Sequence, residues 1–437
     1  MDDREHVIVV GAGAGGLVVA HDLAAAGIPV TVLEAAERVG GQLAPIEVGG
    51  VVIDAAAESY ATRSDAVAAL AAGLGLETVL PLDSPAWLIG ADGRAAPLPA
   101  ASVLGIPAVP FAADVLATIG AAGAWRAQLD KLVPMRRPDR YPSLGDLVRR
   151  RMGPRVLERL VDPVVRGVHS APASSIPIGA ASPDLPQALR RTGSLAAAVA
   201  DLRASSAAGS QVGGIRGGMH RLAEALAQRA VEHGAVVRTG VRVVEAGQNA
   251  VVTAEGERLA GRVVVAAPGV WSEPSRQREI TLAIAVVDAP DLDAAPRGTG
   301  ALIAEGAPGI AARAFTHSSA KWEWLGRSLP AHRHVVRLSY DWMPEDPESR
   351  VLADLRAITG ADVARLEDLA IRSWVRTLAA TAPADGAPGP RLAGEAASGT
   401  GLATIVPRAR QLAADLVASD LNASDLNEGE DHDRIDG

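Results

Sequence analysis

Three glycines near the N-terminus have the spacing of a phosphate-binding turn. Gly11, Gly13 and Gly16 follow residues 7–10, a β-branched run that predicts a strand buried on both faces. The first glycine permits a tight turn, the second lets a pyrophosphate approach the backbone, and the third permits close packing of the next helix. Glu34 follows about twenty residues later, where a carboxylate accepts hydrogen bonds from adenosine ribose hydroxyls. Together these residues predict a dinucleotide-binding site.

These residues lie on the predicted strands, turn and helix of a βαβ unit. The sequence predicts a strand over 7–10, a helix over 15–26 and a second strand over 29–33. The N–H groups and the positive dipole end of that helix would point at the pyrophosphate. An ordinary strand-to-helix turn without a ligand is the alternative, but the acidic residue after the second strand favours the nucleotide.

Composition limits the classes to which the chain can belong. Its 437 residues suffice for two or three domains, and 48% of them are hydrophobic although only 3% are aromatic. A formal net charge of -9 argues against nonspecific nucleic-acid binding, which needs a basic surface. The sequence has no cysteine, which excludes disulfides, thiolate metal sites and cysteine nucleophiles. We predict no metal site.

The sequence contains no segment of the kind that directs a protein into or across a membrane. The N-terminus runs into the first strand without the apolar core of a signal peptide. No stretch approaches the roughly 18 uninterrupted apolar residues of a membrane span. We therefore expect a cytoplasmic protein that at most contacts a membrane surface, and the sequence leaves the oligomeric state open.

A second pattern after Glu34 favours FAD over NAD. Arg38, Gly40 and Gly41 complete an E-x-x-x-R-x-G-G run, which resembles FAD-binding proteins of the amine oxidase and protoporphyrinogen oxidase superfamily. The phrases LVRRRMGPRVLERLVDPVVRGVHS, GGIRGGMHRLAEAL, AKWEWL and GEAASGTGLATIV also occur in the order of that family. The resemblance covers residues 6 to about 418 and is greatest to the bacterial coproporphyrinogen III oxidases.

This resemblance implies an α/β fold, more fully that of an α+β two-domain flavoprotein. A Rossmann-like FAD/NAD(P)-binding domain would comprise residues 1–75, 210–275 and 385–420. A discontinuous substrate-binding domain of mixed sheet and helices would comprise 76–209 and 276–384, with a helical subdomain over about 105–190. Residues 421–437 are acidic and poor in apolar residues, which predicts a disordered tail.

The resemblance also implies which residues contact FAD. Val241 would lie against the adenine half, and the glycines at 399 and 401 would open a second helix whose N–H groups meet the flavin. The complete set of expected FAD contacts comprises Gly11, Gly13, Gly16, Glu34, Ala35, Arg38, Gly41, Gln42, Val241, Gly394, Glu395, Gly401 and Leu402.

The activity implied by the resemblance is the oxidation of a porphyrinogen in haem biosynthesis. FAD would accept hydride from coproporphyrinogen III or protoporphyrinogen IX, and oxygen would accept the electrons. This chemistry needs no strong side-chain base, and no histidine pairs with a carboxylate at a telling spacing. Catalytic residues are therefore left unknown, with Gly167, His169 and Lys321 as candidates, while Arg63 and Arg166 are candidates for binding the substrate carboxylates.

Departures from the family pattern keep two other functions open. Ala56 stands where the family has a glycine beside the flavin ring, and the segments after Pro268 and between Trp374 and Gly394 are short. The chain could therefore be a diverged paralogue without catalytic activity. It could also be another amine oxidase or desaturase, although three Tyr and two Phe offer few rings for an aromatic cage.

Local signals predict several further elements. Glycines 49 and 50 predict a hairpin turn before residue 54, and Ser143 predicts an N-cap for a helix over 143–152. The proline-rich run 98–110 predicts irregular structure. Pro407 predicts that the last helix kinks or ends there.

Overall fold

The computed structural model describes residues 6–132, 140–169, 171–205, 212–270, 277–343, 345–377 and 389–432. The chain divides into two compact units. The first unit comprises Met1–Leu80, Ser210–Arg278 and Val375–Gly437, and the second comprises Pro81–Gly209 and Glu279–Trp374. The two segments that were expected to be short, after Pro268 and before Gly394, fall largely on 271–276 and 378–388, outside the described residues.

A five-stranded parallel sheet forms the centre of the first unit. Its order is β12 (Val236–Arg238), β2 (Val30–Leu33), β1 (Val7–Val10), β16 (Arg262–Val265) and β22 (Arg391–Leu392). All four residues of β1 are buried because layers cover both faces of the sheet, as a continuous β-branched run requires. The predicted strand, helix and strand are confirmed, with the helix α1 at Ala14–Ala25.

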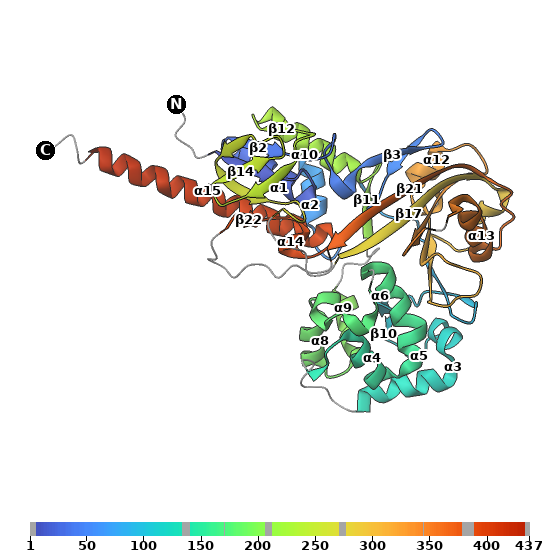
Figure 1. Ribbon diagram of the computed structural model, residues 1–437. Coiled ribbons are helices and arrows are strands. Elements are labelled where there is room, and N and C mark those ends of the chain that lie inside the picture. Colours follow the sequence, from blue (N-terminus) through green and yellow to red (C-terminus); the bar gives the residue numbers. More distant parts are fainter. Residues whose placement is uncertain are drawn as a thin grey trace. The chain divides into compact units, whose positions relative to one another are not determined.

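Helices and a small antiparallel sheet cover opposite faces of this parallel sheet. Leu17 of α1 shares one core with Leu222 of α10 (His220–Glu232) and Val406 of α15 (Leu402–His432). On the other face, Ile8 packs in a separate cluster with Val251 of the sheet β13 (Val243–Ala246), β14 (Ala250–Thr253) and β15 (Arg258–Ala260). Figure 1 shows this arrangement around α1, β2 and β14. The α/β class predicted from the sequence is thereby confirmed.

Shorter elements of the first unit connect these layers. The predicted hairpin is confirmed as β3 (Pro45–Val48) and β4 (Val51–Asp54), and both of its turn glycines have positive φ. A three-stranded sheet joins β5 (Tyr60–Ala61), β11 (Val212–Ile215) and β6 (Thr78–Val79). The helix α2 is Ala66–Gly73, the 3-10 turn η1 is Gly41–Leu43, and α14 is Glu395–Ser398.

The second unit contains a seven-stranded mixed sheet. Its order is β21 (Leu366–Thr377), β17 (Gln277–Asp288), β20 (Arg333–Tyr340), β19 (Ala314–His317), β18 (Gly300–Ile303), β7 (Trp87–Ile89) and β8 (Ala95–Pro97). The helix α13 (Pro347–Thr359) packs on it through Val351, Leu355 and Ile358. Short helices α11 (Ser318–Lys321) and α12 (Glu323–Ser328) follow β19.

A group of helices accounts for the rest of the second unit. Figure 1 shows α3 (Ala113–Gln128), α4 (Leu144–Met152), α5 (Pro154–Val156), α6 (Asp162–His169), α8 (Leu185–Thr192) and α9 (Leu195–Ser205) gathered together. The helix α7 is Ile178–Ala181. The predicted cap of α4 is confirmed, because the Ser143 hydroxyl accepts the Asp146 N–H at 3.1 Å. One apolar cluster unites these helices.

Two local predictions differ from the structure in part. The run 98–110 contains two short paired strands, β9 (Ser102–Val103) and β10 (Ile106–Pro107), joined through Gly105 at φ +76°. The last helix does not end at Pro407, because buried residues on both sides of the proline, Val406 and Ala409, hold the helix in the core. This packing offsets the roughly 3 kcal/mol that an internal proline costs.

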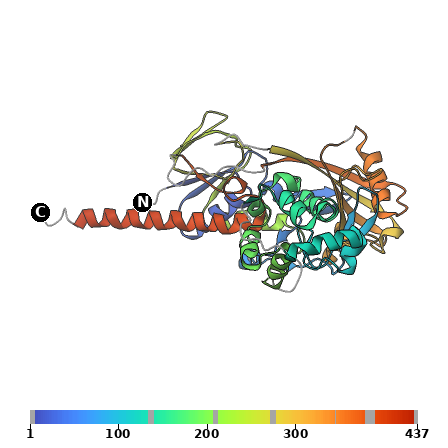
Figure 2. The same cartoon turned by 90° about the horizontal axis from the view of Figure 1, so that it is seen from below.

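The prediction of a disordered tail is also contradicted for part of its length. Helix α15 continues to His432, although residues 421–432 were expected to be disordered, and Figure 2 shows it as one long red helix. Extending an existing helix avoids the unfavourable nucleation step, so a polar segment can continue one that the core has already formed. None of the described helices combines the length and the apolar character needed to cross a membrane.

Candidate nucleotide site in the first unit

The predicted glycine turn joins β1 to α1. Gly11 has φ +98°, and its N–H donates to the Leu33 carbonyl at 2.8 Å. A Cβ on Gly16 would lie 2.0 Å from the Gly11 carbonyl oxygen, far inside any real contact. Both positions therefore need glycine for the turn itself, whether or not a ligand binds.

Gly13 differs from its neighbours because its surroundings leave room. Gly13 is the N-cap residue of α1, has φ -73° and is half-buried. A Cβ there would meet no protein atom within 4 Å. The first N–H groups of a helix have no partner within the helix. The sequence thus keeps glycine where the fold would accept alanine, in front of a helix end that attracts anions. This open cradle fits a pyrophosphate.

Glu34 is held in place by backbone donors. One carboxylate oxygen accepts the Ala12 N–H at 2.7 Å and the other accepts the Ala36 N–H at 2.9 Å. Each oxygen keeps a second lone pair, so both carboxylate oxygens can also accept hydrogen bonds from ribose hydroxyls. Val241 lies beside it, since its N–H donates to the Glu34 carbonyl at 2.8 Å, and Ala35 is exposed. The structure thus brings Glu34 and Val241 together, two of the residues predicted to contact FAD.

The second glycine run folds back onto the first. Gly40 pairs with Gly13 in a parallel bridge, and its N–H donates to the Ala12 carbonyl at 2.8 Å. A Cβ on Gly41 would lie 3.5 Å from the Gly13 Cα. Arg38 donates to the Pro45 carbonyl at 2.7 Å, which pins the loop that carries it. The two glycine motifs therefore belong to one site.

The C-terminal motif reaches the same place. A Cβ on Gly15 would lie 2.6 Å from the Gly394 Cα, so these two backbones are in direct contact. Gln42 Nε2 donates to Glu395 Oε1 at 3.4 Å across 353 residues of sequence. The first and last predicted motifs thus meet, which the sequence suggested only through the resemblance.

A further glycine turn precedes α15. Gly399 and Gly401 have φ of +76° and +95°, and a Cβ on either would meet no protein atom within 4 Å. Leu402 begins the helix and is buried in the core that it shares with α1. This turn, like Gly13, places a helix N-terminus next to open space.

Ala56 lies in a loop that is fastened to the glycine motifs. Ala55 N–H donates to the Ala44 carbonyl at 2.8 Å, and Ala57 N–H donates to the Gln42 carbonyl at 3.2 Å. Within the described ranges, the non-glycine residues with positive φ are Leu104, Ala295 and His332. Ala56 therefore has a backbone conformation that any L-residue adopts, and its departure from glycine introduces no backbone strain.

Sequence reasoning missed a buried pair in this unit. Asp54, at the end of β4, lies 2.9 Å from Nδ1 of His220, at the start of α10. No spacing in the sequence relates the two residues, because they come together only through the fold. An aspartate that ends an apolar strand was the one local signal that could have drawn attention to it.

The remaining predicted residues lie in different surroundings. In the second unit, a Cβ on Gly167 would lie 2.4 Å from Leu302 Cδ2, so close packing accounts for this glycine. Lys321 Nζ lies 5.0 Å from the centre of the Trp322 ring, and His169 ends α6 half-buried. Arg63, in the first unit, is exposed.

Arg166 has a different environment from that of a substrate-binding cation. Its guanidinium forms ion pairs with Asp162 at 2.6 Å and with Glu305 at 2.8 Å. Two carboxylates already balance its charge, so a substrate carboxylate would have to displace one of them.

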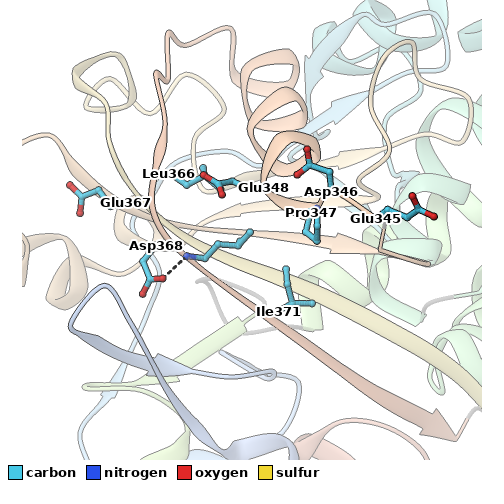
Figure 3. Close-up of a pocket in the computed structure, with 9 residues that line it drawn as sticks. Glu345, Asp346, Pro347, Glu348, Leu366, Glu367, Asp368 and Ile371 are labelled. Carbon is cyan, nitrogen blue, oxygen red and sulfur yellow. Dashed lines mark hydrogen bonds between the residues drawn. The ribbon is translucent and has the colours of Figure 1, made fainter.

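The second unit also has an acidic cavity of about 520 Å³. Figure 3 shows carboxylates from the start of α13 and from β21 around it, and Asp368 accepts the Leu369 N–H at 2.8 Å. The lining residues are Glu345, Asp346, Pro347, Glu348, Leu366, Glu367, Asp368, Leu369 and Ile371, none of which was a predicted site residue. Its negative charge would repel an anionic substrate.

Histidines form a second cluster that the sequence did not predict. His317 Nε2 lies 3.1 Å from His334 Nδ1, His334 Nε2 lies 3.1 Å from Asp293, and His332 Nδ1 lies 2.6 Å from the other Asp293 oxygen. Burial, with help from His334, lowers the pKa of His317 to about 3. Burial also lowers the pKa of His334, and the hydrogen bond from His332 lowers that of Asp293. Among the described residues, no group of three or more such side chains is arranged to hold a metal ion.

This cluster predicts acid sensitivity. Below pH 6.5, the ordinary pKa of histidine, His317 binds a proton in the unfolded chain but stays neutral in the folded protein. The free energy of unfolding therefore decreases as the pH is lowered from about 6.5 to about 3. We expect His317 alone to contribute a loss of roughly 2 kcal/mol between pH 6.5 and 5. Urea unfolding of H317Q should show a weaker pH dependence, whereas H233Q, at an exposed position, should match the wild type. Equal pH dependence in all three proteins would contradict this prediction.

Comparison with known proteins is consistent with this site. Residues 14–294 match the family model for flavin-containing amine oxidoreductases. A coproporphyrinogen III oxidase of Mycobacterium tuberculosis is 30% identical to this chain, over 85% of this chain and 86% of the relative. That of Mycobacterium leprae is 29% identical, over 83% of each chain. A solved structure from Exiguobacterium sp., described as a candidate protoporphyrinogen oxidase, has a TM-score of 0.77 at 21% identity, covering 96% of this chain and 100% of that one.

Proposed function

The chain belongs to the family of flavin-containing amine oxidoreductases, and from this membership we propose that it is an FAD-dependent porphyrinogen oxidase. It would remove hydrogens from coproporphyrinogen III or protoporphyrinogen IX in haem biosynthesis, with oxygen as the electron acceptor. The observation that carries this proposal is the similarity to mycobacterial coproporphyrinogen III oxidases over 85% of the chain. The chain also spans 86% of that relative, so the similarity includes both units.

FAD is the flavin that the first unit suits. The dinucleotide turn at Gly13 and the ribose-binding geometry of Glu34 are of use only if the flavin carries an adenosine and a pyrophosphate. In this proposal, Arg38, Gly41 and Gln42 support the turn, Val241 lies beside the adenosine, and the Gly394–Leu402 segment provides the second helix end. When bound, the flavin accepts hydride and returns electrons to oxygen.

In this proposal, side chains of the protein bind the substrate. Arg63 is exposed, whereas Arg166 is already paired with two carboxylates, so we assign substrate carboxylate binding to Arg63. Gly167, His169 and Lys321 stay candidates for the catalytic face. Each pair of hydrogens that leaves the substrate would reduce one molecule of oxygen to hydrogen peroxide.

The test combines cofactor identification with a rate. The purified protein should release FAD on denaturation, and in air it should convert coproporphyrinogen III or protoporphyrinogen IX into the fluorescent porphyrin with formation of hydrogen peroxide. Free FAD with heat-denatured protein is the control for autoxidation. A rate equal to autoxidation with both substrates would reject the proposed activity. FAD release without turnover would then favour the paralogue without catalytic activity.

A further inference from the structure

The start of α10 receives its cap from a distant strand. Met219 is the N-cap residue and has no side-chain cap of its own. Asp54 accepts the Met219 N–H at 2.9 Å with one oxygen and the His220 N–H at 2.8 Å with the other, from 165 residues away in sequence. A carboxylate at a helix N-terminus satisfies orphan N–H groups and complements the helix dipole.

The His220 ring completes the coordination of this carboxylate. Nδ1 lies 2.9 Å from Asp54 Oδ1, and the two side chains are only 7% and 6% exposed. An ionised carboxylate only accepts hydrogen bonds, which assigns the proton to Nδ1. Gly218, at φ +111°, makes room for the ring, because a Cβ there would lie 2.5 Å from Nδ1. Three donors thus compensate one buried charge.

This pair joins two elements that border the candidate nucleotide site. Asp54 leads directly into residues 55–57, in which the Ala55 and Ala57 N–H groups donate to the Ala44 and Gln42 carbonyls. Gln42 in turn contacts Glu395, which follows Gly394. On the other side, α10 packs against the glycine motifs, since a Cβ on Gly40 would lie 3.4 Å from the Ala223 methyl. The Asp54 carboxylate is therefore the point at which the loop and α10 are fastened together.

We propose that His220 is a positioning residue for the flavin site. Its Nδ1–H fixes the Asp54 carboxylate at the start of α10, and through it holds residues 55–57 against Gln42 and Ala44. The inference rests on the proposed function, since FAD is the group whose site this loop borders. Loss of the donor leaves a buried carboxylate under-compensated, so the carboxylate and the loop shift together.

The experiment compares side chains that place a donor differently. In H220N the amide nitrogen can occupy the position of Nδ1, whereas in H220Q it lies at the distance of Nε2. We expect H220N to bind FAD within about threefold of the wild type and H220Q to bind it about tenfold or more weakly, the range expected for a lost hydrogen bond to a charged group. The visible flavin spectrum of H220Q should shift as well.

Controls separate positioning from stability. H233A changes an exposed histidine at the other end of α10 and should leave FAD affinity and spectrum unchanged. Equal affinities and spectra for H220N, H220Q and the wild type would overturn the proposal, even if melting temperatures differed. Equal weakening in H220N and H220Q would also overturn it, because the position of the donor would not matter. A wild-type chain that took no FAD would overturn the proposed function together with this inference.

Discussion

Replacement of Gly13 by alanine is expected to abolish tight FAD binding while leaving the protein folded. The backbone there has φ -73°, and the added Cβ would meet no protein atom within 4 Å, so the apo protein should tolerate it. That methyl would instead occupy the space that a pyrophosphate needs in order to reach the helix N-terminus. We expect affinity to fall about a hundredfold, or roughly 3 kcal/mol. Titration of apo protein with FAD and a melting curve measure the two effects.

Two neighbouring glycines provide the matched comparison. G16A would place a Cβ 2.0 Å from the Gly11 carbonyl oxygen, and G15A would place one 2.6 Å from the Gly394 Cα. Both variants should lose stability as well as cofactor, because the clash is with protein backbone. A G13A protein that bound FAD as the wild type does would mean that no pyrophosphate lies at this turn.

Replacement of Asp130 by asparagine is expected to destabilise the second unit severely. Asp130 Oδ1 accepts Arg151 Nε at 2.6 Å, and its other oxygen accepts the Ala196 N–H at 3.1 Å. The side chains of Asp130 and Arg151 are 0% and 8% exposed. Asparagine keeps the shape but leaves the arginine charge buried without its counter-ion, which costs about 3–5 kcal/mol. Urea unfolding should show a correspondingly lower midpoint.

An exposed pair and a double variant test whether burial is the cause. Glu158 lies 3.6 Å from Arg149, and both side chains are more than half exposed, so E158Q should cost less than about 1 kcal/mol. Removing both buried charges, as D130N with Arg151→Met, should recover much of the lost stability, since no uncompensated charge remains. Similar losses for D130N and E158Q would contradict the prediction.

The β1–α1–β2 unit could be predicted from the amino-acid sequence. A β-branched run, three spaced glycines and an acidic residue lie within a short stretch, and their effects on turn, helix and strand are local. The hairpin before Asp54 and the Ser143 cap were predictable for the same reason, because each depends on residues a few positions apart. The alternative that the last helix ends at Pro407 was wrong, because packing along α15 outweighs the local cost of the proline.

The contacts between residues far apart in the sequence could not be predicted in this way. No periodicity relates Gly15 to Gly394 or Asp54 to His220, and each contact follows from the layers that pack around one sheet. Packing likewise explains why residue 167 is glycine, because a Cβ there would clash with the Leu302 side chain. Backbone conformation depends on residues that are close in the sequence. The partner of a buried charge, or of a backbone segment in tight contact, depends on how the whole chain folds. The motif that predicts a nucleotide was therefore readable from the sequence, and the distant residues that pack against that motif were not.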